Sequence, residues 1–122
     1  MGDSHYDRDN IFAKILRGEI PNDTVYEDDY VLAFNDINPQ APVHVIVIPK
    51  GQYTTLEDFT ANADDAEITA FYRAVGRIAR DNGLIEQGYR TLTNSGDHAG
   101  QEVPHFHLHI LGGRPLGPML AK

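Results

Sequence analysis

Three histidines stand at every second position near the end of the chain: His105, His107 and His109. Imidazole titrates near neutral pH and can serve as a nucleophile, a proton carrier or a metal ligand. A spacing of two is the side-chain period of a β-strand, so the three rings are predicted to share one face. Phe106 and Leu108, which alternate with them, would then face the core. The row predicts a strand with one buried face and one reactive face.

A metal site is one interpretation of this row. With a rise of about 3.3 Å per residue, the Cα atoms of His105 and His109 would lie about 13 Å apart, whereas zinc–nitrogen bonds measure about 2.0–2.1 Å. One ion held by all three histidines is therefore disfavoured. A site that combines His105 or His107 with His44 and further ligands stays open.

Covalent catalysis is the other interpretation. The chain has no cysteine, so it has no thiolate nucleophile and no disulfide, and it carries neither a Gly-x-Ser-x-Gly turn nor a P-loop. The histidine row is then the strongest candidate for a nucleophile. Imidazole attacks phosphorus well, and a histidine whose far nitrogen donates to a carbonyl presents a lone pair.

Length and charge limit the classes of partner. With 122 residues, 41% of them hydrophobic, the chain is expected to form one globular domain. Eighteen acidic residues against 10 basic ones give a net charge of −8, which disfavours nucleic acid and anionic membranes as partners. A small phosphorylated ligand remains possible, because local N–H groups can bind it. No secretory signal and no apolar run of spanning length are present, so a cytoplasmic location is expected.

The elements that must position the histidines follow from periodicity and caps. Polar residues 1–8 read as a flexible N-terminal tail, and the glycine- and proline-rich segment from about residue 112 as an irregular C-terminal tail; residues 9–122 would form the single domain. Hairpin-length links between the strands indicate an α+β fold with an antiparallel sheet of five strands and two helices. The predicted helices are 11–17 and one that follows the acidic residues 64–65 and ends at 82–83, with a possible helical turn at 55–59; the predicted strands are 24–27, 30–35, 43–49, 88–94 and 103–111.

Residues 105–111 resemble the signature of the histidine triad, or HIT, proteins. The resemblance extends over nearly the whole chain from Asp9 onward and is closest to the nucleotide-binding branch, Hint. It implies a HIT-like sheet that dimerises into a larger continuous sheet. The stretches that carry it, besides the histidine row, are 9–15, 33–44, 47–50, 100–103 and 111–115.

The resemblance also implies an activity. Such proteins are homodimeric hydrolases of purine nucleoside 5′-phosphoramidates, which release an amine and the nucleoside monophosphate without a metal or other cofactor. His107 would attack the phosphorus and form a nucleotidyl-histidine intermediate. His105 would orient it through a backbone carbonyl, His109 and Asn94 would contact the phosphate, and His44 would complete the network.

The nucleotide contacts are implied in the same way. Asp36 would bind the ribose hydroxyls. Further contacts are implied for Phe12, Ile15 and Ile37, which would wall the purine, and for Gln101 and Glu102 in the loop before the histidine row.

Three features depart from the animal members of the branch. Glu102 stands where they carry a serine, and Pro104 replaces a commonly aromatic residue and has no N–H to donate. The tail lacks a tryptophan that some relatives have, which leaves the preferred amine open. A second hypothesis is a purine-nucleotide-binding interaction module with incidental turnover.

Overall fold

The computed structural model describes residues 6–120 and contains one five-stranded antiparallel sheet with the strand order β1-β2-β3-β5-β4. The α+β class and the five antiparallel strands predicted from the sequence are confirmed. No helix in this part of the chain combines the length and the apolar character needed to cross a membrane. The elements are α1 (Ile11–Leu16), β1 (Thr24–Glu27), β2 (Val31–Asn35), β3 (Val43–Pro49), α2 (Leu56–Asn62), α3 (Asp65–Asp81), β4 (Tyr89–Leu92), the short 3-10 helix η1 (Asp97–Ala99) and β5 (Leu108–Gly112).

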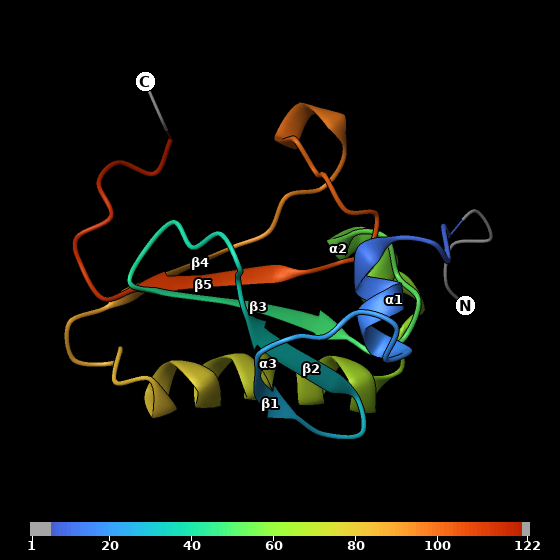
Figure 1. The fold of residues 1–122 in the computed structure, drawn as a ribbon, viewed down its shortest axis with the longest axis horizontal. Helices are drawn as coiled ribbons and strands as arrows, with labels where there is room; N and C mark the ends of the chain where they lie inside the picture. The colour runs from blue at the N-terminus through green and yellow to red at the C-terminus, as the bar shows by residue number, and fades with distance from the viewer. Residues whose placement is uncertain (1–5, 121–122) are drawn as a thin grey trace.

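Alternation along the strands divides the sheet into two faces. On β3, Val45 and Val47 join the cluster that α3 covers, while Ile46 and Ile48 point to the opposite side, where α1 packs. In Figure 1, α3 lies along one side of the sheet and α1 stands at the right-hand end. Because β5 pairs Ile46 with His109, the histidines share the α1 side of the sheet.

The helices begin where the sequence offers caps. The side chain of Asn10 accepts from the backbone N–H of Ala13 and starts α1. Asp64 and Glu67 form a capping box at the start of α3, in which each side chain accepts from the other residue's N–H. The predicted long helix is therefore confirmed, and the predicted helical turn at 55–59 is a longer helix, α2.

The predicted strand over residues 103–111 is wrong for its first half, since β5 begins at Leu108. Pro104 has no N–H, the N–H of His105 donates to the carbonyl of Val103 at 2.8 Å, and that of Phe106 donates to the carbonyl of Tyr53 at 2.7 Å. These donors are used in a tight turn and against a loop, so the segment cannot continue the ladder. The strand predicted over 88–94 is likewise shorter, at Tyr89–Leu92.

The ends of the chain are described only in part. Residues 1–5 of the predicted N-terminal tail lie outside the described residues, whereas Tyr6 and Arg8 make contacts with the rest of the chain. At the other end, β5 stops at Gly112, and residues 113–120 contain no helix or strand.

Candidate active site

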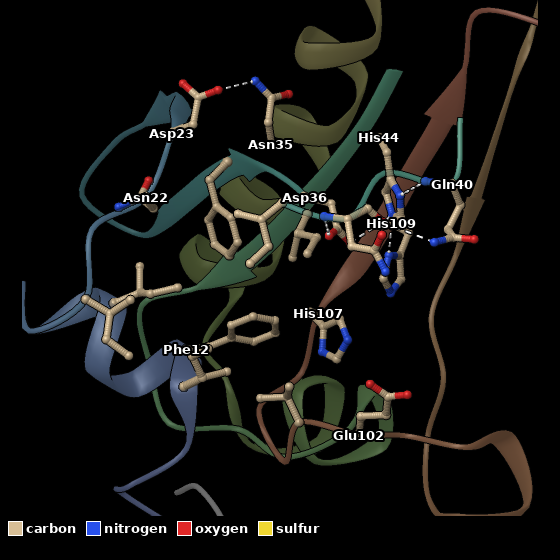
Figure 2. A pocket seen from close by; sticks show the side chains of 18 of the residues that line it. Phe12, Asn22, Asp23, Asn35, Asp36, Gln40, His44, Glu102, His107 and His109 are labelled. Atoms are coloured by element: carbon tan, nitrogen blue, oxygen red, sulfur yellow. Dashed lines mark hydrogen bonds and ion pairs between the residues drawn. The ribbon is translucent and has the colours of Figure 1, made fainter. Parts of the chain in front are cut away.

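A pocket of about 470 Å³ opens on the α1 side of the sheet. Its walls come from α1, β2, β3, β5 and the loop after η1, which are far apart in the sequence. Figure 2 shows His107 and His109 from the histidine row, Asp36 and His44 around this space, with the ring of Phe12 projecting from α1. The pocket brings together ten of the eleven predicted site residues: Phe12, Ile15, Asp36, Ile37, His44, Asn94, Gln101, Glu102, His107 and His109.

His107 has one engaged nitrogen and one open nitrogen. Its Nδ1 lies 2.7 Å from the carbonyl oxygen of His105. A carbonyl only accepts, so Nδ1 carries the proton and Nε2 keeps its lone pair. Burial lowers the pKa of His107, against smaller opposing effects that include the charges of Asp36 and Glu102. The edge-on ring of Phe12, 4.9 Å away between centroids, limits how the imidazole can tilt.

His105 is the predicted residue that the pocket does not include. Its side chain is fully buried, and its Nε2 donates to the carbonyl oxygen of Pro49 at 2.9 Å. Burial lowers its pKa from 6.5 to about 4, so the ring is neutral near pH 7. His105 therefore lies outside the pocket and holds His107 in place. Its ring is hydrogen-bonded to Pro49 of β3, and its backbone carbonyl accepts from His107.

His44 and His109 form a hydrogen-bonded pair with the opposite arrangement of protons. The backbone N–H of Gln40 donates to Nδ1 of His44 at 3.0 Å, so in the neutral ring the proton is on Nε2. That Nε2 lies 2.8 Å from Nδ1 of His109, which must accept, and the remaining proton of His109 is then on Nε2. Burial lowers the pKa of His44, partly opposed by Asp36, and lowers that of His109 to about 4.

The result is two adjacent imidazoles with complementary roles. The rings of His107 and His109 lie 5.1 Å apart between centroids. The first offers a lone pair at Nε2 and the second offers an N–H at Nε2. An electrophile with an oxygen to be hydrogen-bonded, such as a phosphoryl group, fits such a pair.

Asp36, His44 and His109 also bring one ligand atom each within 4.8 Å of one another, a spacing that a metal ion could bridge. His44 accepts a backbone N–H at Nδ1 and lies 2.8 Å from His109 through Nε2, so binding an ion there would break the bond between the two rings. His105 uses both of its nitrogens within the chain. The hydrogen bonds of the histidines therefore oppose a metal centre built on them.

The other end of the pocket is apolar. Phe12 and Phe34 meet edge to face at 5.6 Å between centroids, and Ile15 and Ile46 belong to the same buried cluster. This surface suits a flat aromatic ligand such as a purine. Ile37 lies at the rim with 96% of its surface exposed, so it would reach a ligand only from outside.

The loop after η1 supplies two of the predicted residues, which differ in availability. The side-chain oxygen of Gln101 accepts from the N–H of Gly96, and its amide donates to the carbonyls of Thr54 and Val103. Its nucleotide contact stays a prediction, and its amide is already engaged in holding the loop. Glu102 is exposed, and in Figure 2 its carboxylate lies beside the ring of His107.

Sequence reasoning missed several residues at the site. The hydroxyl of Thr93 donates to the carbonyl of His107 at 2.6 Å, and that of Tyr6 lies 2.5 Å from Nδ1 of His105. Asn35 donates to Asp23 at 2.8 Å on the pocket rim. Thr93 lies within the strand predicted over 88–94, which could have indicated it, but no local pattern signals a contact of Tyr6 across 99 positions.

Known proteins resemble the chain over nearly its full length. The family model described as HIT domain matches residues 17–116. An uncharacterized HIT-like protein of Azospirillum brasilense is 57% identical over 96% of both chains. A protein of Escherichia coli strain K12 named purine nucleoside phosphoramidase is 50% identical over 93% of this chain and 94% of its own.

Solved structures of similar proteins also resemble this chain closely. A histidine triad protein from Clostridium difficile has a TM-score of 0.82 and 44% identity over 93% of this chain and 98% of its own. A HIT family hydrolase from Clostridium thermocellum has a TM-score of 0.84 and 40% identity over 94% and 99%. Taken with the histidine geometry, these similarities show that the chain belongs to the HIT domain family.

Proposed function

We propose that this protein hydrolyses purine nucleoside 5′-phosphoramidates to the nucleoside monophosphate and an amine. The observation that carries the proposal is the pair of unequal imidazoles, with a lone pair on His107 and an N–H on His109 facing one pocket. The apolar wall of the pocket beside these two rings favours a purine as the base of the substrate. The similarity to a protein named purine nucleoside phosphoramidase supports the choice of a P–N bond.

The proposed reaction has two displacements at phosphorus. Nε2 of His107 attacks, the P–N bond breaks, and the amine leaves after taking a proton from solvent water; the nucleotidyl group is then carried by His107. Nδ1–H of His107 stays on the carbonyl of His105, which stabilises the positive charge of the ring. Water next attacks the same phosphorus and gives one proton back to the solvent, the P–Nε2 bond breaks, and the nucleoside monophosphate leaves as His107 regains its lone pair. Throughout, Nε2–H of His109 hydrogen-bonds a phosphoryl oxygen.

The substrate would be held by groups around the reacting centre. Asp36, whose Oδ1 accepts from the N–H of Asn38 at 2.8 Å, keeps Oδ2 near His44 and is proposed to bind the ribose hydroxyls. Phe12 and Ile15 are proposed to wall the base, with Ile37 closing it from the rim. The amide of Asn94, which lines the pocket, is proposed to contact the phosphate.

The test is turnover of an adenosine 5′-phosphoramidate whose amine fluoresces on release. We expect His107→Ala to lose on the order of 10³-fold or more in kcat, as enzymes do when a nucleophile is removed. Wild-type protein quenched during turnover should gain the mass of one nucleotide, and the variant should not. His98→Ala, which changes an exposed histidine outside the pocket lining, is the matched control.

Two outcomes would contradict the proposal. Near wild-type turnover by His107→Ala would exclude His107 as the nucleophile. A wild-type protein that binds AMP but does not cleave phosphoramidates would favour a nucleotide-binding module. The pocket would then bind the nucleotide without catalysing a reaction.

A further inference from the structure

Tyr6 contacts the histidine row from outside the pocket. Its hydroxyl lies 2.5 Å from Nδ1 of His105, and the two rings meet nearly edge to face at 5.6 Å between centroids. Tyr6 is not part of the pocket lining, so a nucleotide in the pocket would not touch it. Its contact is therefore with the protein that supports the nucleophile.

The direction of this hydrogen bond follows from the other end of the ring. Nε2 of His105 lies 2.9 Å from the carbonyl oxygen of Pro49, which can only accept, so Nε2 carries the proton. In the neutral ring Nδ1 must then accept, and the hydroxyl of Tyr6 donates to it. Because the side chain of His105 is fully buried, losing this donor would leave a buried lone pair unsatisfied.

Hydrogen bonds at the ring of His105 and at its backbone carbonyl thus link Tyr6 to the nucleophile through this one residue. Tyr6 donates to the ring of His105, that ring donates to Pro49, and the carbonyl of His105 accepts from Nδ1 of His107 at 2.7 Å. Each bond restricts the next group. The ring of His105 is held at both nitrogens, which fixes the residue whose carbonyl orients His107.

Tyr6 is itself held by the start of α1. The side chain of Asn10 donates to the carbonyl of Asp7 at 2.7 Å while its oxygen caps the helix. Arg17 donates to the carbonyl of Arg8 at 2.8 Å. These bonds tie the two residues that follow Tyr6 to the helix whose Phe12 borders the ring of His107.

We propose that Tyr6 is a positioning residue for the nucleophile: its hydroxyl, by donating to Nδ1 of His105, holds the carbonyl that orients His107. The inference rests on the proposed function for its kinetic consequence. The hydrogen bonds of His105 on which it is based involve no substrate. Tyr6 acts on the nucleophile and not on nucleotide binding.

The experiment compares wild type with Tyr6→Phe, which keeps the ring and removes the hydroxyl. We expect the rate of nucleotidylation in single-turnover assays with an adenosine 5′-phosphoramidate to fall about 5- to 20-fold, with KM changed less than about twofold. Histidine-selective ¹⁵N spectra without substrate should show that Nδ1 of His105 has lost a donor and that the nitrogen signals of His107 have shifted.

The matched control is Tyr26→Phe, which removes a hydroxyl that donates to Asp28 at 2.8 Å on β1, away from the pocket. Unchanged rate and unchanged His107 spectra in Tyr6→Phe would overturn the inference, as would an equal loss of rate in Tyr26→Phe. If wild type itself does not cleave the phosphoramidate, the proposed function is wrong. In that case the spectra alone decide: a shift of the His107 signals supports the positioning role, and their constancy overturns it.

Discussion

At the scale of single residues, the site depends on the protonation of four chemically identical rings. The carbonyls of His105 and Pro49 require N–H groups opposite them, whereas the N–H of Gln40 requires a lone pair. Backbone groups thus decide that His107 is an acceptor toward the pocket and His109 a donor. Burial keeps the rings neutral, because the charged form would lose its hydration.

The buried ring of His105 predicts how stability depends on pH. Its folded pKa of about 4 lies below its ordinary value of 6.5, so between these values the unfolded chain binds a proton that the folded chain does not. The free energy of unfolding is therefore highest above pH 6.5, decreases as the pH falls, and levels off near pH 4. The total decrease due to His105 amounts to about 3 kcal/mol for a fully buried group. Urea unfolding between about pH 7 and pH 4.5 measures it.

The control for this prediction is His105→Gln, whose amide can still donate to Pro49 but does not titrate. Its free energy of unfolding should change less steeply with pH than that of wild type. Equal slopes in the two proteins would show that His105 is not held neutral.

Glu102 predicts a charge effect on ligand binding. Its exposed carboxylate lies beside the ring of His107, where the phosphate is proposed to bind, so two negative charges would repel each other. We expect Glu102→Gln to bind AMP about threefold more tightly at low salt, with the difference vanishing at high salt. Calorimetric titration at two salt concentrations measures this.

Glu86→Gln removes the same charge from an exposed position outside the pocket lining and should leave AMP affinity unchanged. A tightening that persists at high salt in Glu102→Gln would contradict an electrostatic origin.

At the scale of elements, α1 and β5 face each other across the pocket. The strand presents His109 beside Ile46 of β3, and the helix places Phe12 and Ile15 against the same side of the sheet. A six-residue helix is marginal by itself, so its position depends on its cap and its packing. The geometry of the base wall therefore depends on the stability of α1.

Removing the cap tests this dependence. Asn10→Ala should cost about 1–2 kcal/mol in the free energy of unfolding and weaken AMP binding several-fold, because α1 carries the base wall. Thr55→Ala removes the cap of α2, whose helix does not line the pocket. It should cost about 1 kcal/mol and leave AMP affinity unchanged. Equal effects of both variants on AMP affinity would contradict a local role of α1.

At the scale of the whole molecule, the sheet has two open edges, β1 and β4. We propose that residues 9–122 act as one domain and that two copies pair along β4 to give the continuous sheet implied by the family resemblance. Tyr89 and Leu92 on β4 are 41% and 37% exposed, and Ile85 just before the strand is 55% exposed. Apolar side chains at an open strand edge favour association.

Sedimentation of the purified chain tests this pairing. We expect a dimer for wild type and a shift to monomer for Leu92→Asp, since a charge on this edge opposes burial. Tyr30→Asp changes a residue of similar exposure, 42%, in the β1–β2 turn and should remain dimeric. A wild-type monomer, or equal dissociation of both variants, would contradict pairing through β4.

The sequence by itself determined the features that local chemistry controls. Alternation predicted the buried face of β5 and an apolar run predicted β3, while Asn10 as a cap and the acidic residues 64–65 marked the starts of α1 and α3. These signals succeed because side-chain period and capping involve residues only a few positions apart. The resemblance to HIT proteins, which the comparisons confirm, named the residues that the pocket brings together.

Tertiary structure alone decided how those residues differ. The protons of the histidines depend on carbonyl and N–H groups supplied by distant segments, such as Pro49, 56 positions from His105. The break of the predicted strand before Leu108 depends on the carbonyl of Tyr53, and the support of His105 depends on Tyr6. Such partners have no periodic trace in a sequence, because they meet only when the sheet and α1 are assembled.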